Sequence, residues 1–364
     1  MEIELQQELL RRWYELMKEQ EREVAVERKE KIDSAYLYQL DPEMKKLYDL
    51  LVVRYHLMCE DLDKATASLS KVGPVEGDCK HWLNYYYYFF RGIYHYDCQE
   101  YKTAIESYMK AERLVYDISL EEIGEFFYKL ASAYHRTYKI SLSIRCAEKA
   151  LEVFKKLGHS KRIADCKILL GINNKDIEQY QEAERHYHDA LIHAAKTENE
   201  SLRMTVYLNF GALYSEQNDP ETAISYLTKA ERLIQTNRNH FKVRISYLLA
   251  KNYFYTDQTK EGQQKLHEGI ILAKFDPVFY YRFDLLKAKF IELTRFEEAY
   301  KEGVSYYNNR EEWQLVIEYS EDLAAYYRRT ENYQEACHYY DLAILARNNL
   351  EKGRGLSYVE EIIV

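Results

Sequence analysis

Asn173 and Asn209 have side chains whose chemistry suits the binding of an extended peptide. A carboxamide carries both a hydrogen-bond donor and an acceptor, so it can pair with the N–H and C=O groups of a peptide unit. The two residues are 36 positions apart, and we expect them on the leading helices of successive repeats. For the pair Asn173-Asn174 a structural role, capping or ending a helix, remains an open alternative. That alternative is weaker for Asn209, which stands between two apolar residues.

Motifs for self-contained catalysis are absent from the sequence. His186 and His188 are two residues apart, so they face different sides of a helix and cannot form an i, i+4 zinc pair. No G-x-S-x-G, P-loop or G-x-G-x-x-G motif occurs. Acidic pairs such as Glu121-Glu122 are typical of solvated helix faces. We therefore assign no catalytic residue and expect neither a metal nor a cofactor.

The elements that position the asparagines are expected to be helices. The chain has 364 residues, of which only 12 are glycine and 4 are proline, against a usual combined share of roughly 12%. Sandwiches and barrels need frequent turn residues, so this composition excludes them. Hydrophobic residues at 47% and charged residues at 30% are globular values. The sequence predicts an all-α fold.

A repeat of small residues organises most of the chain. Four copies share a small residue, an alanine, an aromatic residue or leucine, and a second alanine: Gly92, Ala104, Tyr108 and Ala111; Gly171, Ala183, Tyr187 and Ala190; Gly211, Ala223, Leu227 and Ala230; Ala324, Ala336, Tyr340 and Ala343. Weaker copies contain Ala131 and Ala250, and a degenerate one surrounds Phe296–Ala299. The first small residue of successive copies stands at positions 92, 131, 171, 211 and 250, so it recurs every 39 or 40 positions. Tetratricopeptide repeats have a similar pattern with a period of 34. We expect a superhelix of about seven such helix pairs.

The first 60 residues lack the repeat and predict a bundle of three amphipathic helices, Glu2–Gln20, Glu21–Tyr38 and Glu43–Cys59. The first has an apolar stripe of Leu5, Leu9, Trp13, Leu16 and Met17. Asp41-Pro42 is typical of a helix start. The expected domains are the bundle (1–60), a linker (61–80) with Gly73, Pro74 and Gly77, the repeats (81–352) and a tail (353–364).

The net charge of −9 argues against a direct nucleic-acid partner, which would need a basic surface. The aromatic run Trp82–Phe90 could stack on single-stranded bases, but packing between helices explains it more simply. The longest stretch without charge, Met204–Ser215, is too short to cross a membrane. Six scattered cysteines without a C-x-x-C pair predict reduced thiols and a cytoplasmic location.

Several segments, in this order and spacing, resemble the Rap family: Trp13-Tyr14, Leu50–Arg54, Trp82–Tyr94, Ala104–Glu112, Glu125–Tyr134, Asn173–Asp176 and Tyr207–Gly211. The resemblance covers roughly residues 5–350. It implies a three-helix bundle joined to tetratricopeptide repeats, in a regulator of sporulation or competence. It also implies that the bundle binds a response regulator or DNA-binding regulator, and that a short secreted Phr-like peptide binds the repeats and switches the protein off.

Site residues follow from the resemblance. Asn173 and Asn209 would hold the peptide backbone, Asp176 would pair with a basic peptide residue, and Tyr134 and Lys129 would line the neighbouring repeat. The catalytic glutamine position of phosphatase members falls on Pro42, which has no side-chain donor to position a water molecule. Gln39 and Glu43 are near, but only a shift of one helical turn would let either replace it. Sequestration of a regulator is therefore the leading hypothesis. An active aspartyl-phosphate phosphatase is the alternative, followed by a plain repeat scaffold.

Overall fold

The computed structural model describes residues 3–19, 21–36, 40–74, 81–115, 118–197, 199–234 and 239–354. These residues form helices and turns, and they contain no strand. The chain divides into two compact units, Met1–Thr137 (unit 1) and Tyr138–Val364 (unit 2). The predicted all-α fold is confirmed.

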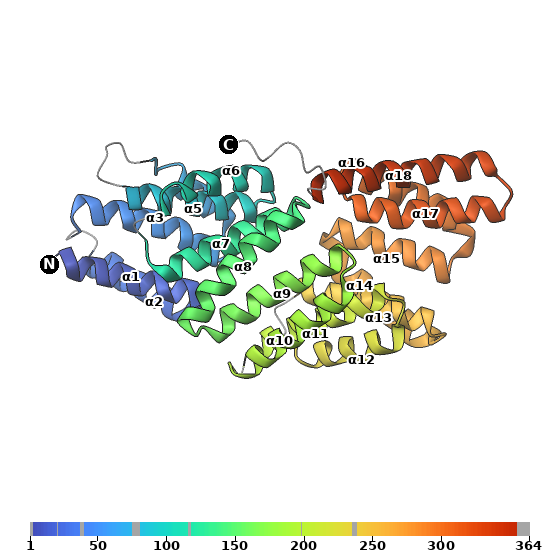
Figure 1. The fold of residues 1–364 in the computed structure, drawn as a ribbon, viewed down its shortest axis with the longest axis horizontal. Helices are drawn as coiled ribbons and strands as arrows, with labels where there is room; N and C mark the ends of the chain where they lie inside the picture. Colours follow the sequence, from blue (N-terminus) through green and yellow to red (C-terminus); the bar gives the residue numbers. More distant parts are fainter. Residues whose placement is uncertain are drawn as a thin grey trace. The chain divides into compact units, whose positions relative to one another are not determined.

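Unit 1, blue to green in Figure 1, contains the predicted bundle and the first repeat helices. Its described helices are α1 (Ile3–Glu19), α2 (Arg22–Lys31), the π-helix η1 (Ile32–Tyr36), α3 (Pro42–Met58), α4 (Leu62–Leu69), α5 (His81–Asp97), α6 (Tyr101–Glu112) and α7 (Leu120–Arg136). Helices α1 to α3 match the three predicted helices. Part of the predicted linker 61–80 is helical, because α4 lies in it. Gly77 lies outside the described residues, and the domain limits stay predictions.

Helix α1 buries a different stripe from the predicted one. Leu5 is 58% exposed, whereas Gln6, Leu10 and Tyr14 are buried beside Trp13 and Met17. The reason is that α1 packs on two sides. The Trp13 ring stacks on Tyr48 of α3 with centroids 5.7 Å apart, and the Tyr14 ring meets Phe90 of α5 edge-on at 5.5 Å.

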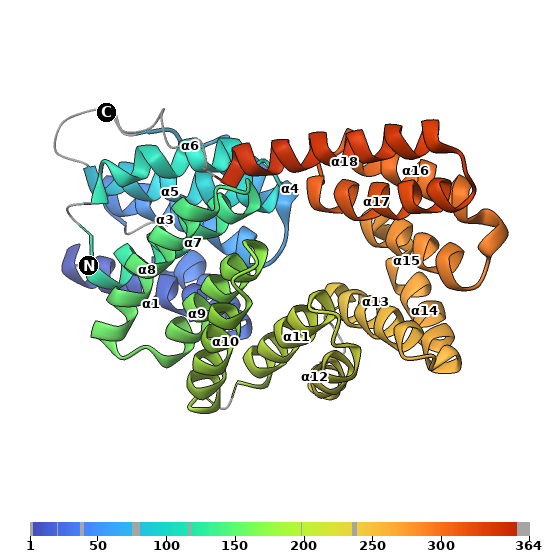
Figure 2. The same cartoon turned by 45° about the vertical axis from the view of Figure 1, so that its right-hand side comes forward.

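Unit 2, green to red in Figure 1, contains the remaining repeat helices, and Figure 2 shows them from a second side. They are α8 (Ile140–Leu157), α9 (Ser160–Asp176), α10 (Tyr180–Ala195), α11 (Glu200–Glu216), α12 (Pro220–Arg232), α13 (Asn239–Tyr255), α14 (Thr259–Leu272), the 3₁₀ turn η4 (Ala273–Phe275), α15 (Pro277–Phe290), the 3₁₀ turn η5 (Leu293–Arg295), α16 (Phe296–Asn309), α17 (Trp313–Arg329) and α18 (Tyr333–Arg354). The fourteen helices from α5 to α18 match seven predicted pairs. Residues 355–364 of the predicted tail lie outside the described part.

Three of the four prolines begin helices. Pro42, Pro220 and Pro277 each follow an aspartate at the N-cap of α3, α12 and α15. Each aspartate side chain accepts backbone N–H groups of the first turn, as Asp41 does from Glu43 at 2.7 Å. Proline fits the first helical position because its fixed φ suits a helix and an N–H there has no intrahelical partner. The predicted start at Asp41-Pro42 is thereby confirmed.

The turns within pairs use left-handed residues that are not glycine. Gln99, Tyr138, Glu178, Asn218 and Asp257 have φ between 56° and 64°, and they recur at the same 39- or 40-residue spacing as the small residues. In the α9–α10 turn the N–H of Gln179 donates to Asn174 O at 2.9 Å, which closes the helix end. Glycine is the usual residue at such a position. Its absence explains how a chain with so few glycines builds so many turns.

The small residues of the repeat allow close packing within pairs. A Cβ atom at Gly171 of α9 would overlap the ring of Tyr187 of α10, and one at Gly211 of α11 would overlap Leu227 of α12. Tyr187 and Leu227 are fully buried. Between α9 and α18 the core is a series of clusters, each shared by neighbouring pairs. This is the organisation expected of a stacked-repeat protein.

Candidate functional site

The candidate binding residues of unit 2 lie on the first helices of successive pairs. Helices α9, α11 and α13 contact one another in that order. Each carries a buried asparagine: Asn173 on α9, Asn209 on α11 and Asn252 on α13 are 0%, 4% and 1% exposed. We call these three residues the amide set. A buried carboxamide must find hydrogen-bond partners, so its partners show whether its role is structural.

Asn173 is only partly satisfied. Its Nδ2 donates to Ser143 Oγ of α8 at 2.9 Å. Its Oδ1 atom is buried and has no hydrogen-bond partner among the described residues. The open alternative of a helix-ending role therefore fits Asn174 better, since its Nδ2 donates to Leu170 O at 2.8 Å near the end of α9.

Asn252, which sequence reasoning missed, is the structural counterpart of Asn173. Each stands two residues after the small residue of its repeat, Ala250 or Gly171. Asn252 Nδ2 donates to Ser215 Oγ of α11 at 2.9 Å and to Leu248 O at 2.7 Å, so both of its N–H groups are used. The signal was present in the sequence as this shared offset.

Asn209 is not equivalent to Asn173 in the repeat. It stands two residues before Gly211, so it lies about one helical turn from the position that Asn173 occupies. The spacing of 36 instead of 40 residues reflects this difference. Its Nδ2 donates to Thr205 O of the same helix at 2.8 Å.

Asp176 is already engaged in an ion pair. Lys175 Nζ lies 2.9 Å from Asp176 and 2.6 Å from Glu216 of α11, so one cation bridges two carboxylates. Burial alone would lower the pKa of Lys175, but the two carboxylates raise it above its ordinary value. Glu216 is a member of this cluster that sequence reasoning missed.

Lys129 and Tyr134 lie on α7, in unit 1, where Tyr134 is 9% exposed. The structure therefore groups Asn173, Asp176 and Asn209 on two adjacent helices of unit 2. A role of Lys129 and Tyr134 at the same site stays a prediction.

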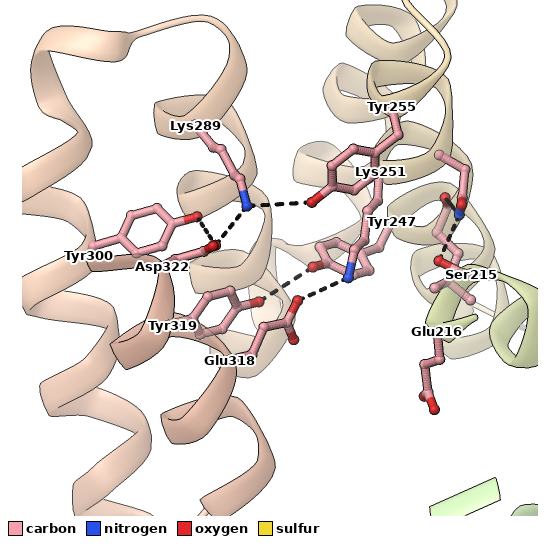
Figure 3. Close-up of polar contacts among 12 residues, drawn as sticks. Ser215, Glu216, Tyr247, Lys251, Tyr255, Lys289, Tyr300, Glu318, Tyr319 and Asp322 are labelled. Carbon is pink, nitrogen blue, oxygen red and sulfur yellow. Dashed lines mark hydrogen bonds and ion pairs between the residues drawn. The ribbon is translucent and has the colours of Figure 1, made fainter. Parts of the chain in front are cut away.

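Side chains of α13, α15, α16 and α17 form a second polar region, the brace, defined by Tyr247, Lys251, Tyr255, Lys289, Tyr300, Glu318, Tyr319 and Asp322 (Figure 3). Lys251 Nζ pairs with Glu318 at 2.9 Å, and the hydroxyl groups of Tyr247 and Tyr319 lie 3.3 Å apart. Lys289 pairs with Asp322 at 2.7 Å. Its Nζ also lies 3.4 Å from the hydroxyl oxygen of Tyr255. These contacts tie α13 to α17, two repeats further along the chain.

In unit 1 the bundle is held against α7. The Tyr14 hydroxyl donates to Glu122 at 2.7 Å, and Lys18 Nζ lies 3.0 Å from Glu121. The interpretation of Glu121-Glu122 as a solvated pair was wrong for Glu122, which is 1% exposed because α1 covers it. Burial raises the pKa of Glu122 to about 7.

Near Pro42, the side-chain carboxamide of Gln6 already takes part in a hydrogen bond. Gln6 of α1 is 2% exposed, and its Oε1 accepts the backbone N–H of Asp41 at 3.0 Å. Pro42 itself begins α3. Gln39 lies outside the described residues.

Among the helices of the described residues, none has the length and apolar character needed to span a bilayer.

The tetratricopeptide repeat family matches residues 169–236, which include α10, α11 and α12 and about the second half of α9. Transcriptional activator NprA of Geobacillus stearothermophilus is 28% identical over 353 residues, which cover 93% of this chain and 86% of that protein. Regulatory protein RapD of Bacillus subtilis is 25% identical over 346 residues, covering 90% and 95%. Response regulator aspartate phosphatase E of Bacillus subtilis is 30% identical over 243 residues, covering 63% and 64%.

Solved structures agree on the fold. A Rap protein complexed with competence and sporulation factor has a TM-score of 0.81 at 22% identity, covering 97% of this chain and 100% of that one. NprR in complex with its cognate peptide NprX has a TM-score of 0.70 at 21% identity, covering 92% and 97%. Over nearly its whole length, the chain is thus similar to Rap and NprA proteins, in agreement with the resemblance to the Rap family seen in its sequence.

Proposed function

We propose that this protein is a peptide-sensing regulator, in which a short signalling peptide binds along α9 and α11 and controls the capture of a regulatory protein. The observation that carries the proposal is the spare hydrogen-bonding capacity of two members of the amide set, Asn173 and Asn209. The Asn173 oxygen has no partner among the described residues, and Asn209 has a second N–H beyond the one that bonds Thr205. Rap and NprR structures that share this fold were solved with peptides bound.

The partner of the bundle is expected to be a response regulator or a DNA-binding regulator, since family members are named as regulatory proteins and as a transcriptional activator. Residues 1–60 would supply the partner surface and residues 81–352 the peptide site. The contacts of Tyr14 and Lys18 with α7 offer a means of control. A peptide that favours one arrangement of the bundle shifts the protein toward it by the difference in its affinity for the two arrangements. We expect the protein to act in the cytoplasm, in sporulation or competence.

Asp176 would receive a basic peptide residue in this proposal. Lys175 already partners Asp176 and shares it with Glu216. A basic peptide residue would then join Lys175 beside these two carboxylates. Asp176→Asn should weaken a peptide with arginine or lysine more than the same peptide with alanine at that place.

An aspartyl-phosphate phosphatase is the second candidate, because phosphatase E is 30% identical to this chain over 243 residues. Against it stands Pro42 at the start of α3 in the place of the family's catalytic glutamine. The nearby Gln6 carboxamide is buried and bonded to Asp41. Incubation with a phosphorylated sporulation-type response regulator, with phosphate loss followed over time, distinguishes the candidates. Accelerated loss would favour the phosphatase and exclude pure sequestration.

The leading proposal is tested by affinity selection of short random peptides on the full chain, followed by calorimetry on a selected peptide. Asn209→Ala should weaken binding by about 1–3 kcal/mol, because a peptide group loses its partner. Asn199→Ala is a matched control on the same helix. It removes the α11 N-cap, whose side chain accepts Leu202 N–H at 3.0 Å, and should lower stability without changing peptide affinity. If no peptide is selected, the proposal is wrong.

A further inference from the structure

Arg282 of α15 is an unpaired cation next to the brace. The carbon of its guanidinium group lies 4.1 Å from the ring centroid of Tyr247 and 5.2 Å from that of Phe279. Its Nε atom is buried, and no hydrogen-bond partner for it lies among the described residues. Within the described part of the chain, Arg282 makes no hydrogen bond and no ion pair, so only aromatic rings contact its charge.

The charges around Arg282 do not balance. Lys251 and Lys289 each have a carboxylate partner, Glu318 at 2.9 Å and Asp322 at 2.7 Å. Arg282 is the third cation of this group, and among the described residues no third carboxylate pairs with it. Arg282 is close enough to Glu318 to help lower the pKa of that carboxyl group. Glu318, however, already forms an ion pair with Lys251. The region therefore carries one positive charge in excess.

A guanidinium group in such a place is suited to an anion. Contact with an aromatic face stabilises the cation, but the buried N–H group still lacks an acceptor among the described residues. Arginine binds carboxylates through two parallel hydrogen bonds, and such bonds strengthen where water is excluded. Buried Tyr247 and Tyr307 provide this environment.

We propose that Arg282 forms an anion subsite that receives a carboxylate of the bound peptide, either its C-terminal carboxylate or an acidic side chain. This inference rests on the peptide-binding function proposed above. It adds that the peptide must present a negative charge to α15. The charge preference is opposite to that of the Asp176 and Glu216 cluster on α9 and α11, so a peptide with a basic and an acidic group would match both.

The test uses the full chain and two pools of short random peptides that differ only at the C-terminus, free acid in one and amide in the other. Peptides retained by the protein are identified by mass spectrometry. Selection from the free-acid pool alone would assign the subsite to the C-terminal carboxylate. Selection from both pools, with an aspartate or glutamate in every peptide retained from the amide pool, would assign it to a side chain.

Three variants complete the test. Arg282→Gln should lower the affinity of a selected peptide roughly tenfold to a hundredfold, the range for a lost charge-assisted hydrogen bond, and Arg282→Lys should retain part of it. Arg310→Gln is the matched control, because Arg310 also lies over a tyrosine ring, that of Tyr306 at 5.7 Å. It should bind like the unmodified protein.

Two outcomes overturn the subsite while leaving peptide sensing intact. One is selection of peptides without any carboxylate, and the other is full affinity in Arg282→Gln. If neither pool yields a peptide, the proposed function fails as well. Should Arg282→Gln fail to fold, the comparison of the two pools on the unmodified protein still decides.

Discussion

The amide set and the brace differ in how their polar groups are partnered. In the amide set, Asn173 leaves its oxygen without a partner among the described residues. In the brace, both carboxylates pair with lysines, and the Tyr247 and Tyr319 hydroxyl groups contact each other. A buried polar group that lacks a hydrogen-bond partner lowers the stability of the fold, whereas a partner removes most of this penalty. The difference is consistent with the proposal that α9 and α11 bind a peptide, while the contacts from α13 to α17 join the repeats to one another.

The largest expected effect concerns Glu122 of unit 1. The environment of this buried carboxyl group contrasts with that of Glu318 in the brace. The cation paired with Glu122 is Lys18 at 3.9 Å, whereas Lys251 lies 2.9 Å from Glu318. Burial raises the pKa of Glu122 from 4.5 to about 7. Burial alone would also raise the pKa of Glu318, but Lys251 and Arg282 lower it.

A carboxyl group whose pKa is raised by folding holds its proton longer in the folded state than in the unfolded state. The free energy of unfolding should therefore fall by about 3 kcal/mol as the pH rises from about 4.5 to about 7. Urea unfolding at several pH values measures this, and Glu122→Gln should flatten the dependence. Glu318 should contribute in the other direction, with stability lost only as the pH falls below its ordinary range. Equal slopes for Glu122→Gln and the unmodified protein would contradict the assignment.

The next largest effect concerns the packing of Gly171 of α9 against Tyr187 of α10. Gly171→Ala should lower the free energy of unfolding by about 2 kcal/mol, because the added Cβ would overlap the buried Tyr187 ring. Gly73→Ala is the control, since apart from Gly73 and its chain neighbours no heavy atom of the described residues lies within 4 Å of the position of its Cβ. Thermal and denaturant unfolding provide the measurement. A neutral Gly171→Ala would mean that α9 and α10 can separate at little cost.

The two equivalent asparagines should differ in stability. Asn252→Ala removes two hydrogen bonds, to Ser215 and Leu248, and should cost about 1–2 kcal/mol. Asn173→Ala removes one bond to Ser143 together with an unsatisfied oxygen, so it should cost less. Denaturant unfolding of both variants measures the difference. Equal losses would remove the distinction between a structural and an available carboxamide.

The brace can be tested by a double-mutant cycle on Lys251→Met and Glu318→Gln. We expect a coupling energy of about 1 kcal/mol or less, because the Glu318 side chain is 38% exposed and solvent weakens the pair. The coupling is measured from the unfolding free energies of the two single variants and the double variant. Zero coupling would show that the Lys251–Glu318 pair does not stabilise the brace, which would then depend on its tyrosines and on the Lys289–Asp322 pair.

The smallest effect concerns the turns between paired helices. Glu178 has φ of 64°, a conformation that glycine adopts without strain. Glu178→Gly should raise the free energy of unfolding by about 0.5 kcal/mol. Glu178→Ala keeps the strain and should give no gain. A loss of stability in Glu178→Gly would indicate that this side chain stabilises the turn.

Local patterns of residues determine much of the fold. The spacing of Gly171, Ala183 and Tyr187 predicts a close helix pair, and Asp41-Pro42 predicts the start of α3; both are present. Such features depend on side chains within one helix or one pair of helices, where periodicity and capping act over short distances. The turns are the local exception, because Glu178 and its equivalents occupy positions where glycine is the usual residue.

Only the tertiary structure decided which polar groups meet. Asn252 finds Ser215 across 37 residues, and Lys251 finds Glu318 across 67. These pairings depend on the rotation between successive repeats, which no local pattern specifies. The same holds for Glu122, which is buried because a helix distant in sequence covers it. It also holds for Arg282, whose Nε is buried by neighbouring helices that offer it no hydrogen-bond partner within the described part of the chain. The sequence by itself thus determined the helix pairs and their order, while the burial and pairing of charge required the assembled repeats.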